Sequence, residues 1–227
     1  MGRTKGPNTT KDEIFRVASR MFLEVGYSGT YPRMIADELD IRPSNITYYF
    51  PTKEHLLLAV VEILCDFQYM MLEAEEDIGF GSAAAICLET MSVAVACNES
   101  DTARDLFINV FQGELCRNYL RNNHVERAKR IFAKECEGWT DEQFHQAELL
   151  VMGLQYAAII PADANISLKM RLEGALNQIL SVYQVAEEER QKEIATVLAK
   201  DCRGISKRIL GAFIDFVKER SRKRANQ

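Results

Sequence analysis

The stretch RMIADELDIRPSNITYYFPTK, residues 33–53, determines how the rest of this 227-residue chain is interpreted. Apolar residues recur there at helical spacing in two groups, which predicts two short helices joined by a tight turn. Pro43 suits the first position of the second helix, and Pro51 ends that helix. The predicted inward-facing residues are Ile35, Ala36, Leu39, Ile46 and Phe50.

A supporting helix precedes this pair. Thr10 and Glu13 have the capping-box spacing that predicts a helix start at Thr10. Gly26 is the residue type that ends a helix. We therefore expect residues 1–9 to form a flexible arm and residues 1–52 to form a domain of three helices.

The outward face of the second helix suits the major groove of DNA, because its side chains are short or planar and include no acid. Asparagine can pair with adenine, and a threonine methyl group can pack on thymine. Tyrosine hydroxyl and lysine ammonium groups can hold phosphates on either side. The alternative, a helical hairpin with an ordinary polar face, stays open on spacing alone. The candidate DNA-binding residues are Arg33, Arg42, Pro43, Ser44, Asn45, Thr47, Tyr48, Tyr49 and Lys53.

The net charge of −5, taken alone, argues against a nucleic-acid binder. Residues 1–53, however, contain eight Lys or Arg and six Asp or Glu, a balance of +2, so the rest of the chain carries −7. An acidic body with a locally basic end is compatible with DNA binding through that end only.

Residues 14–57 resemble the N-terminal domain of TetR-family transcriptional regulators. The resemblance implies a helix-turn-helix DNA-binding domain, a fourth helix that leads into a larger helical effector domain, and a homodimer on a palindromic double-stranded DNA operator. The matching residues are FLEVGY at 22–27, Thr30, Ile35–Ala36, Ile41, Ile46-x-x-Tyr49-Phe50 and Lys53-Glu54-x-Leu56-Leu57.

The resemblance also implies roles for the candidate residues. Arg33 would contact a base or a phosphate, base edges would face Arg42, Pro43, Ser44 and Thr47, and phosphates would be held by Asn45, Tyr48, Tyr49 and Lys53. The chain departs from the family pattern at Tyr31, Asp40 and Thr47, where a Thr or Ser, a Gly and a Tyr are usual. The base preference of relatives therefore does not transfer to this chain.

Residues 53–227 are predicted to form a helical effector-binding and dimerisation domain, beginning with a long helix from Thr52 to about Asp77. A second capping box, Thr140 to Gln143, opens a later helix. The resemblance implies that this helix and the amphipathic segment 166–185 pack against the same two helices of the second subunit in the dimer. The alternative is that both helices pack only within their own subunit.

The C-terminal segment 187–222 is predicted to add one or two further helices. It is acidic at its start and basic at its end, as helix termini favour. The basic run RSRKR is expected to lie in solvent, far from the recognition helix.

Large, soft side chains in the body favour an apolar or aromatic small-molecule effector, because methionine and aromatic residues adapt to flat apolar ligands. For each of them singly, the alternative is a place in the ordinary core. The candidate effector-binding residues are Phe67, Met70, Met71, Met91, Phe107, Phe111, Tyr119, Trp139, Met152 and Tyr156.

The sequence shows no pattern typical of catalysis or metal binding. It has no glycine-rich phosphate loop, no Ser-His-Asp pattern, and no metal-ligand spacing among its six cysteines and three histidines. No enzyme activity, cofactor or metal is therefore expected. No secretory signal and no apolar run of the ~20 residues that a membrane helix needs are visible. We expect a cytoplasmic protein without a membrane partner.

These patterns together predict an all-α regulator, most simply a repressor that its effector releases from DNA. One alternative is a DNA-binding protein that is controlled by a protein partner or has no small-molecule inducer. A more remote alternative is an enzyme or carrier built on a helical bundle.

Overall fold

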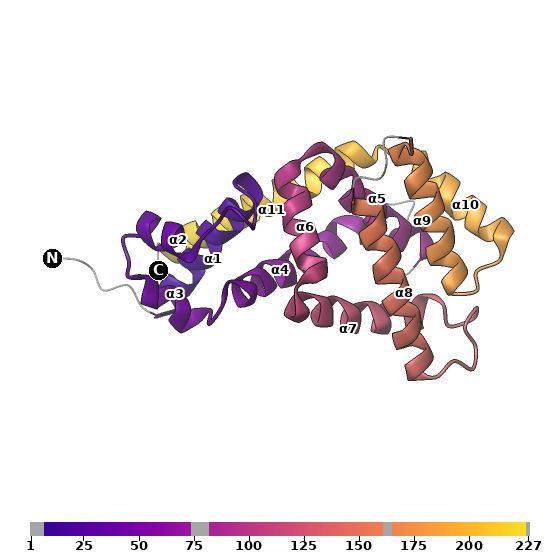
Figure 1. Ribbon diagram of the computed structural model, residues 1–227, viewed down its shortest axis with the longest axis horizontal. Coiled ribbons are helices and arrows are strands. Elements are labelled where there is room, and N and C mark those ends of the chain that lie inside the picture. Colours follow the sequence, from indigo (N-terminus) through magenta and orange to yellow (C-terminus); the bar gives the residue numbers. More distant parts are fainter. Residues whose placement is uncertain (1–6, 74–81, 161–164, 226–227) are drawn as a thin grey trace.

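The computed structural model describes the backbone of residues 7–73, 82–160 and 165–225, and the side chains of residues 10–69, 82–160 and 165–216. The described residues form eleven helices and no strand, as the sequence predicted (Figure 1). They are α1 Pro7–Glu24, α2 Pro32–Glu38, α3 Pro43–Tyr49, α4 Lys53–Glu73, α5 Ala83–Glu99, α6 Asp101–Gln112, α7 Glu114–Ile131, α8 Asp141–Ile159, α9 Leu168–Val182, α10 Glu187–Leu198 and α11 Cys202–Ala225.

Helix α1 begins earlier than the capping box predicted. It starts at Pro7, so residues 7–9 are helical and the assignment of residues 1–9 to a flexible arm is wrong for these three. Proline tolerates the first helical position because the amide hydrogen that it lacks would have no partner there. At the other end Gly26 has φ of +92°, in the left-handed region that terminates helices.

Helices α2 and α3 form the predicted pair. Pro32 and Pro43 each occupy the start of a helix, and Ile46 and Phe50 are buried. Asp40 lies in the turn between the helices with φ of +51°. Left-handed backbone is costly for residues other than glycine, although Asp tolerates it better than most. This strained position is the one at which the chain departs from a family glycine.

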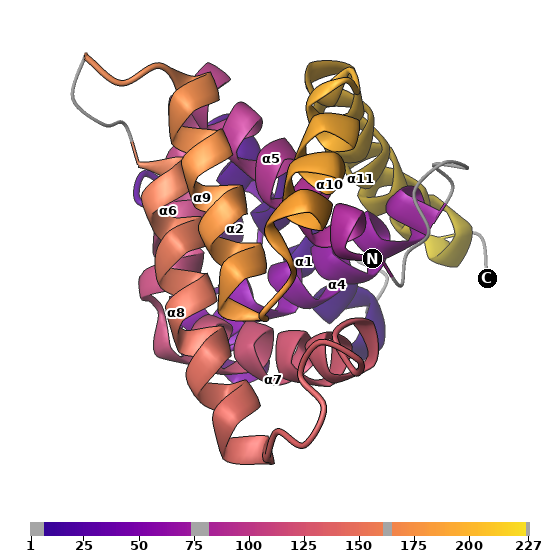
Figure 2. The same ribbon diagram turned by 90° about the vertical axis from the view of Figure 1, so that its right-hand side faces the viewer.

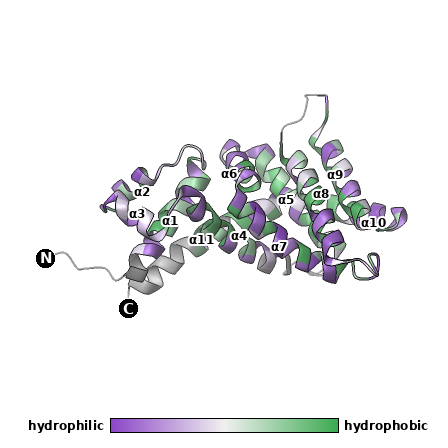
Figure 3. Ribbon diagram, turned by 60° about the horizontal axis from the view of Figure 1, so that its bottom comes forward, coloured by the Kyte–Doolittle hydropathy of each residue, from purple (hydrophilic) through white to green (hydrophobic). Residues whose placement is uncertain are grey.

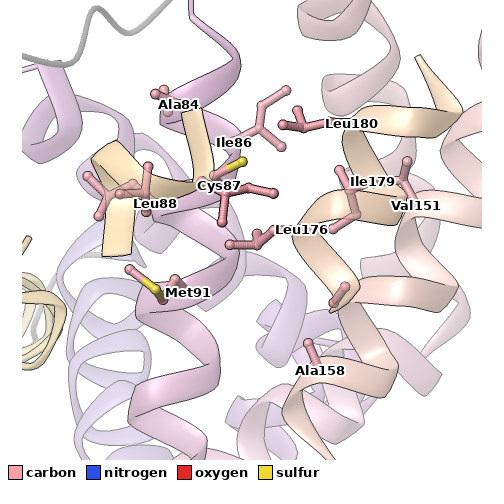
Figure 4. Packing of buried hydrophobic residues seen from close by; sticks show 14 of the residues in the cluster. Ala84, Ile86, Cys87, Leu88, Met91, Val151, Ala158, Leu176, Ile179 and Leu180 are labelled. Carbon is pink, nitrogen blue, oxygen red and sulfur yellow. The ribbon is translucent and has the colours of Figure 1, made fainter. Parts of the chain in front are cut away.

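The helices of the body surround α5, which is apolar on nearly every side. Its residues pack against α6, α8, α9, α10 and α11. Figure 4 shows Cys87 of α5 next to Leu176 and Ile179 of α9, with Val151 of α8 behind them. The buried residues of the body are mostly hydrophobic, and Figure 3 shows hydrophobic and hydrophilic residues alternating along its helices. A helix buried all round has no single apolar stripe, which explains the lack of periodicity in its sequence.

Several predicted helix ends in the body are confirmed. Thr52 accepts a hydrogen bond from the backbone of His55 at the start of α4, and Thr140 with Gln143 forms a complete capping box. The predicted end of α4 near Asp77 lies outside the described residues. The segment from 187 onward forms two helices, and the second extends to Ala225 rather than 222.

Helix α11 takes a course that the sequence analysis did not anticipate. It packs on α5 in the body and on α1 in the N-terminal domain. Its backbone reaches the same end of the molecule as α3 (Figure 1). The expectation that the basic C-terminal run lies far from the recognition helix is therefore wrong, because the apolar stripe of α11 runs on through Phe213, which is buried beside Phe67.

The conformation of Asp40 generates a stability prediction. Asp40→Gly should raise the free energy of unfolding by up to about 1 kcal/mol, because glycine adopts positive φ without steric cost. Asp40→Val should lower it, because a β-branched residue is least compatible with that backbone. Urea denaturation of the two variants and the unchanged protein measures both effects. Equal stability of the Gly and Val variants would contradict the prediction.

Candidate nucleic-acid interface and effector cavity

The recognition helix α3 is held by its two apolar residues and exposes the rest of its surface. Ile46 and Phe50 anchor it in the N-terminal core, whereas Tyr48 is 80% exposed. The exposed side chains of this helix and the turn before it are Arg42, Pro43, Ser44, Asn45, Thr47 and Tyr48. An α-helix with such a face can enter the major groove without steric obstruction.

The two adjacent tyrosines have different environments. Their rings contact edge to face, with centroids 4.9 Å apart. Tyr49 is half-buried against the N-terminal core, so it supports the outward position of Tyr48. The ring of Tyr48 is therefore supported by Tyr49, and its hydroxyl faces solvent.

Lys53 lies over aromatic rings at the first turn of α4. Its ammonium nitrogen is 4.1 Å from the ring centroid of Tyr27 and 5.4 Å from that of Tyr31. Burial lowers the pKa of Lys53, and the negative charge of Asp105 opposes that effect. Tyr31, one of the three residues that depart from the family pattern, thus contacts this lysine at the start of α4.

The acidic residues of α2 are paired with arginines. Asp37 lies 3.8 Å from Arg33, and Glu38 bonds to Arg20 on α1. Because the side chain of Arg33 is 84% exposed, its ion pair with Asp37 is weak, and Arg33 can turn to another anion at little cost. Each carboxylate of α2 therefore has an arginine partner, so neither adds an unpaired negative charge to the surface around α3.

Comparison with known proteins agrees with this geometry. Residues 14–60, which cover most of α1, all of α2 and α3 and the first turns of α4, match the profile of the family described as bacterial regulatory proteins, tetR family. The N-terminal part of the chain is similar to this family. The match ends within α4, so the similarity to this family covers the N-terminal helices and not the rest of the chain.

Curated proteins similar to this chain include the HTH-type transcriptional regulator RutR of Escherichia coli K12 and that of Shigella flexneri. Each is 34% identical over 85 residues, which cover 37% of this chain and 39% of the relative. The chain thus matches about two fifths of the length of these relatives. No solved structure matches it significantly.

Two side chains fasten the TetR domain to the body. Asp105 of α6 accepts a hydrogen bond from the backbone N–H of Ser28 at 2.7 Å and another from its hydroxyl. Glu54 of α4 accepts one at 2.8 Å from the backbone N–H of Leu115, at the start of α7. A displacement of α6 or α7 would therefore act directly on the domain that carries α3.

A cavity of about 50 Å³ lies among α4, α5, α6, α7 and α8. Of the ten predicted effector residues, the structure places Phe107 and Phe111 in its wall. Its other lining residues are Val61, Leu64, Cys65, Gln68, Glu89, Thr90, Val93, Val110, Leu120, His124, Gln155 and Ile159. The volume corresponds to a few water molecules, so a larger ligand requires the surrounding side chains to move.

The remaining predicted effector residues lie elsewhere. Met91 and Met152 are buried in the two core clusters, and Phe67 packs on Phe213 and Phe216 of α11. Trp139 packs on Phe144 and Tyr156 on Phe111, while Tyr119 lies half-buried beside the N-terminal cluster. The side chains of Met70 and Met71 are outside the described residues.

A group of buried polar residues adjoins the cavity, and the sequence analysis missed it. Glu148 of α8 accepts hydrogen bonds from His124 of α7, at 3.0 Å, and from the hydroxyl of Tyr183. Glu89 of α5 accepts one from Arg127 of α7 at 2.5 Å. One feature of the sequence could have indicated this group. Glu89 is the one charged residue in the otherwise uncharged run 83–98.

The described residues contain no group of three or more potential metal ligands. Within the same residues, no helix is long and apolar enough to cross a membrane.

His124 generates a pH prediction. Burial by itself would lower its pKa, but the hydrogen bond to Glu148 and the charges of Glu148 and Glu89 outweigh burial and raise it above 6.5. The folded protein thus holds this proton more tightly than the unfolded chain. The resulting stabilisation is fully present below about pH 6.5 and is lost as pH rises through the folded pKa.

The free energy of unfolding should therefore fall as pH rises above about 6.5, and His124→Asn should lack this component. Urea denaturation over a pH series measures it. His145→Asn, at an exposed position of α8, is the matched control. An identical pH profile for the two histidine variants would contradict the prediction.

Proposed function

We propose that this chain is a transcriptional repressor that binds a palindromic double-stranded DNA operator as a homodimer and is released by a small-molecule effector. The observation that carries the proposal is the TetR-family match over residues 14–60 together with the exposed face of α3. The protein would act in the cytoplasm, where the DNA is.

In this proposal the DNA contacts come from α2, α3 and the start of α4. Arg33, Arg42 and Thr47 reach base edges, together with Pro43 and Ser44, whose small side chains allow a close approach. Phosphates are held by Asn45, Tyr48, Tyr49 and Lys53. The exposure of Tyr48 and the position of Lys53 beside α3 support these roles.

An exposed apolar stripe on α8 and α9 supports the homodimer. The two helices lie side by side (Figure 2). Leu149 and Leu150 are 54% and 57% exposed, and Met170 is 64% exposed. Gly153 and Gly174 continue these faces with nothing within 4 Å of an added Cβ, so a partner helix could approach closely there. Large apolar side chains exposed on two neighbouring helices favour a protein interface there.

The contacts of α6 support control by an effector. Phe107 and Phe111 on one side of α6 line the cavity, and Asp105 on the same helix holds Ser28 of the TetR domain. An effector that enlarges the cavity would displace α6 and with it the DNA-binding domain. Such control requires that the effector bind the displaced state more tightly than the DNA-bound state.

Footprinting on the DNA that flanks the gene tests the function as a whole. We expect protection of a palindrome whose half-sites lie one helical turn or a multiple apart, because a dimer presents two copies of α3. Absence of any protected palindrome at modest salt would count against the proposal.

Two substitutions test the DNA contacts. Tyr48→Ala should weaken binding to operator and to unrelated DNA by similar factors, because a phosphate contact carries no sequence information. Arg33→Ala should cost about 1–3 kcal/mol on the operator and relax specificity at one base pair. Fluorescence anisotropy measures both, with Arg130→Ala on α7 as the control. Unchanged operator selectivity in Arg33→Ala would refute its base-reading role.

A further substitution tests the dimer. Leu150→Glu should convert the protein to a monomer, because it places a charge within the exposed apolar stripe, and should weaken operator binding as a result. Sedimentation equilibrium at micromolar concentration measures the mass, and Ala133→Glu, at an exposed position after α7, is the control. A dimeric Leu150→Glu protein would rule out this face as the interface.

A further inference from the structure

The cavity of about 50 Å³ has one apolar side and one polar side. The apolar side is formed by residues such as Val61, Leu64 and Phe111. The polar side is formed by Glu89, His124 and Gln155, and these three residues also line a second cavity of about 20 Å³. The three polar residues therefore separate the two cavities, and a ligand in the larger one would meet them.

Gln155 offers an unused acceptor at this wall. It is 7% exposed, and its Nε2 donates to Thr90 Oγ1 at 3.3 Å. Its Oε1 is buried without a hydrogen-bond partner. An amide oxygen left unpaired in the interior costs free energy that a donor from a ligand would recover.

His124 offers a second acceptor only above its raised pKa, where the imidazole is neutral. Glu148 accepts from both His124 Nδ1 and Tyr183, which fixes the proton of the neutral imidazole on Nδ1. Its Nε2 is buried and has no hydrogen-bond partner. The nearest carboxylate oxygen, Oε1 of Glu89, is 3.9 Å away, which exceeds hydrogen-bond distance.

Above its raised pKa His124 is neutral, and the charges of this cluster then do not balance, so the ligand measurements below are made on the alkaline side of that pKa. Glu89 and Glu148 contribute two negative charges, and Arg127 contributes one positive charge through its bond to Glu89. Tyr69 of α4, whose ring lies 5.1 Å from the Arg127 guanidinium, adds no charge because burial raises its pKa. A negative, acceptor-rich wall beside an apolar one favours a particular ligand chemistry.

We propose that the cavity binds an amphipathic small molecule with a cationic or N–H-donating nitrogen head, such as an amine or amidine, whose head meets Glu89, His124 and Gln155 and whose apolar body displaces Phe107 and Phe111. This inference rests on the proposed effector control and revises the purely apolar effector that the sequence favoured. Acids of the same shape are disfavoured, because their carboxylate would face the carboxylate of Glu89.

Three probes of nearly the same shape test the head group: benzamidine, benzamide and benzoate. We expect benzamidine to raise the melting temperature of the full chain most, benzamide less, and benzoate not at all, because at one ligand concentration the tighter-binding ligand stabilises the folded state more. Calorimetry with the free protein gives the dissociation constants. No stabilisation by millimolar benzamidine, or equal affinity for benzoate, would overturn the inference.

Variants then test the assigned residues. Glu89→Gln should weaken benzamidine binding about tenfold or more and benzamide binding less, because it removes the negative charge. Gln155→Leu should weaken both probes and keeps the inference testable if Glu89→Gln does not fold. Gln178→Leu, at an exposed position of α9, is the control. Unchanged affinities in Gln155→Leu would show that the head does not lie at this wall.

These measurements are made without DNA, so they are independent of operator binding. Release of operator DNA by benzamidine is then measured separately. Binding of the probe without release would leave the ligand chemistry intact and overturn the proposed control, whereas release by a molecule that does not compete with benzamidine would overturn the assignment of this cavity.

Discussion

The contact between Asp105 and Ser28 is the constraint on which the rest of the structure depends. The Asp105 carboxylate accepts from both the backbone and the hydroxyl of Ser28, and Gly26 makes room for it, since an added Cβ would lie 2.8 Å from Asp105 Oδ2. Phe107 and Phe111 follow on the same helix at the cavity wall. Hydrogen bonds to a carboxylate weaken steeply with distance and angle, so a shift of α6 would weaken these two bonds to Ser28.

The buried cluster of Glu89, His124, Arg127 and Glu148 makes the body costly to assemble. Ionised groups lose their hydration when buried, and only well-formed pairs offset that loss. The members come from α5, α7 and α8, so each pair also fixes how two helices meet. An apolar core of the same shape would avoid this loss of hydration. Buried charged groups beside a cavity are typical of a functional site.

Helix ends and the outward face of α3 could be predicted from the sequence, because local chemistry decides them. Prolines at 32 and 43, Gly26 and the Thr140 capping box fixed helix ends, and the buried Ile46 fixed the outward face of α3. Sequence reasoning was less successful where distant segments meet. Large apolar residues such as Met91 and Trp139 occur both in hydrophobic cores and in pocket walls. Their residue type therefore could not show which of the two environments each one occupies. The polar wall depends on the register of three helices, which no local pattern encodes.

The course of α11 has a practical consequence for any fusion protein. Its backbone ends beside α1, at the end of the molecule where α3 lies, rather than at the distal end of the body (Figure 1). A purification tag or a fluorescent protein fused at the end of α11, after Ala225, would therefore begin at the end of the molecule that carries α3, where its bulk would obstruct the exposed face of that helix. A reporter intended to leave DNA access undisturbed is better inserted in the loop between α7 and α8, at the opposite end of the helical body.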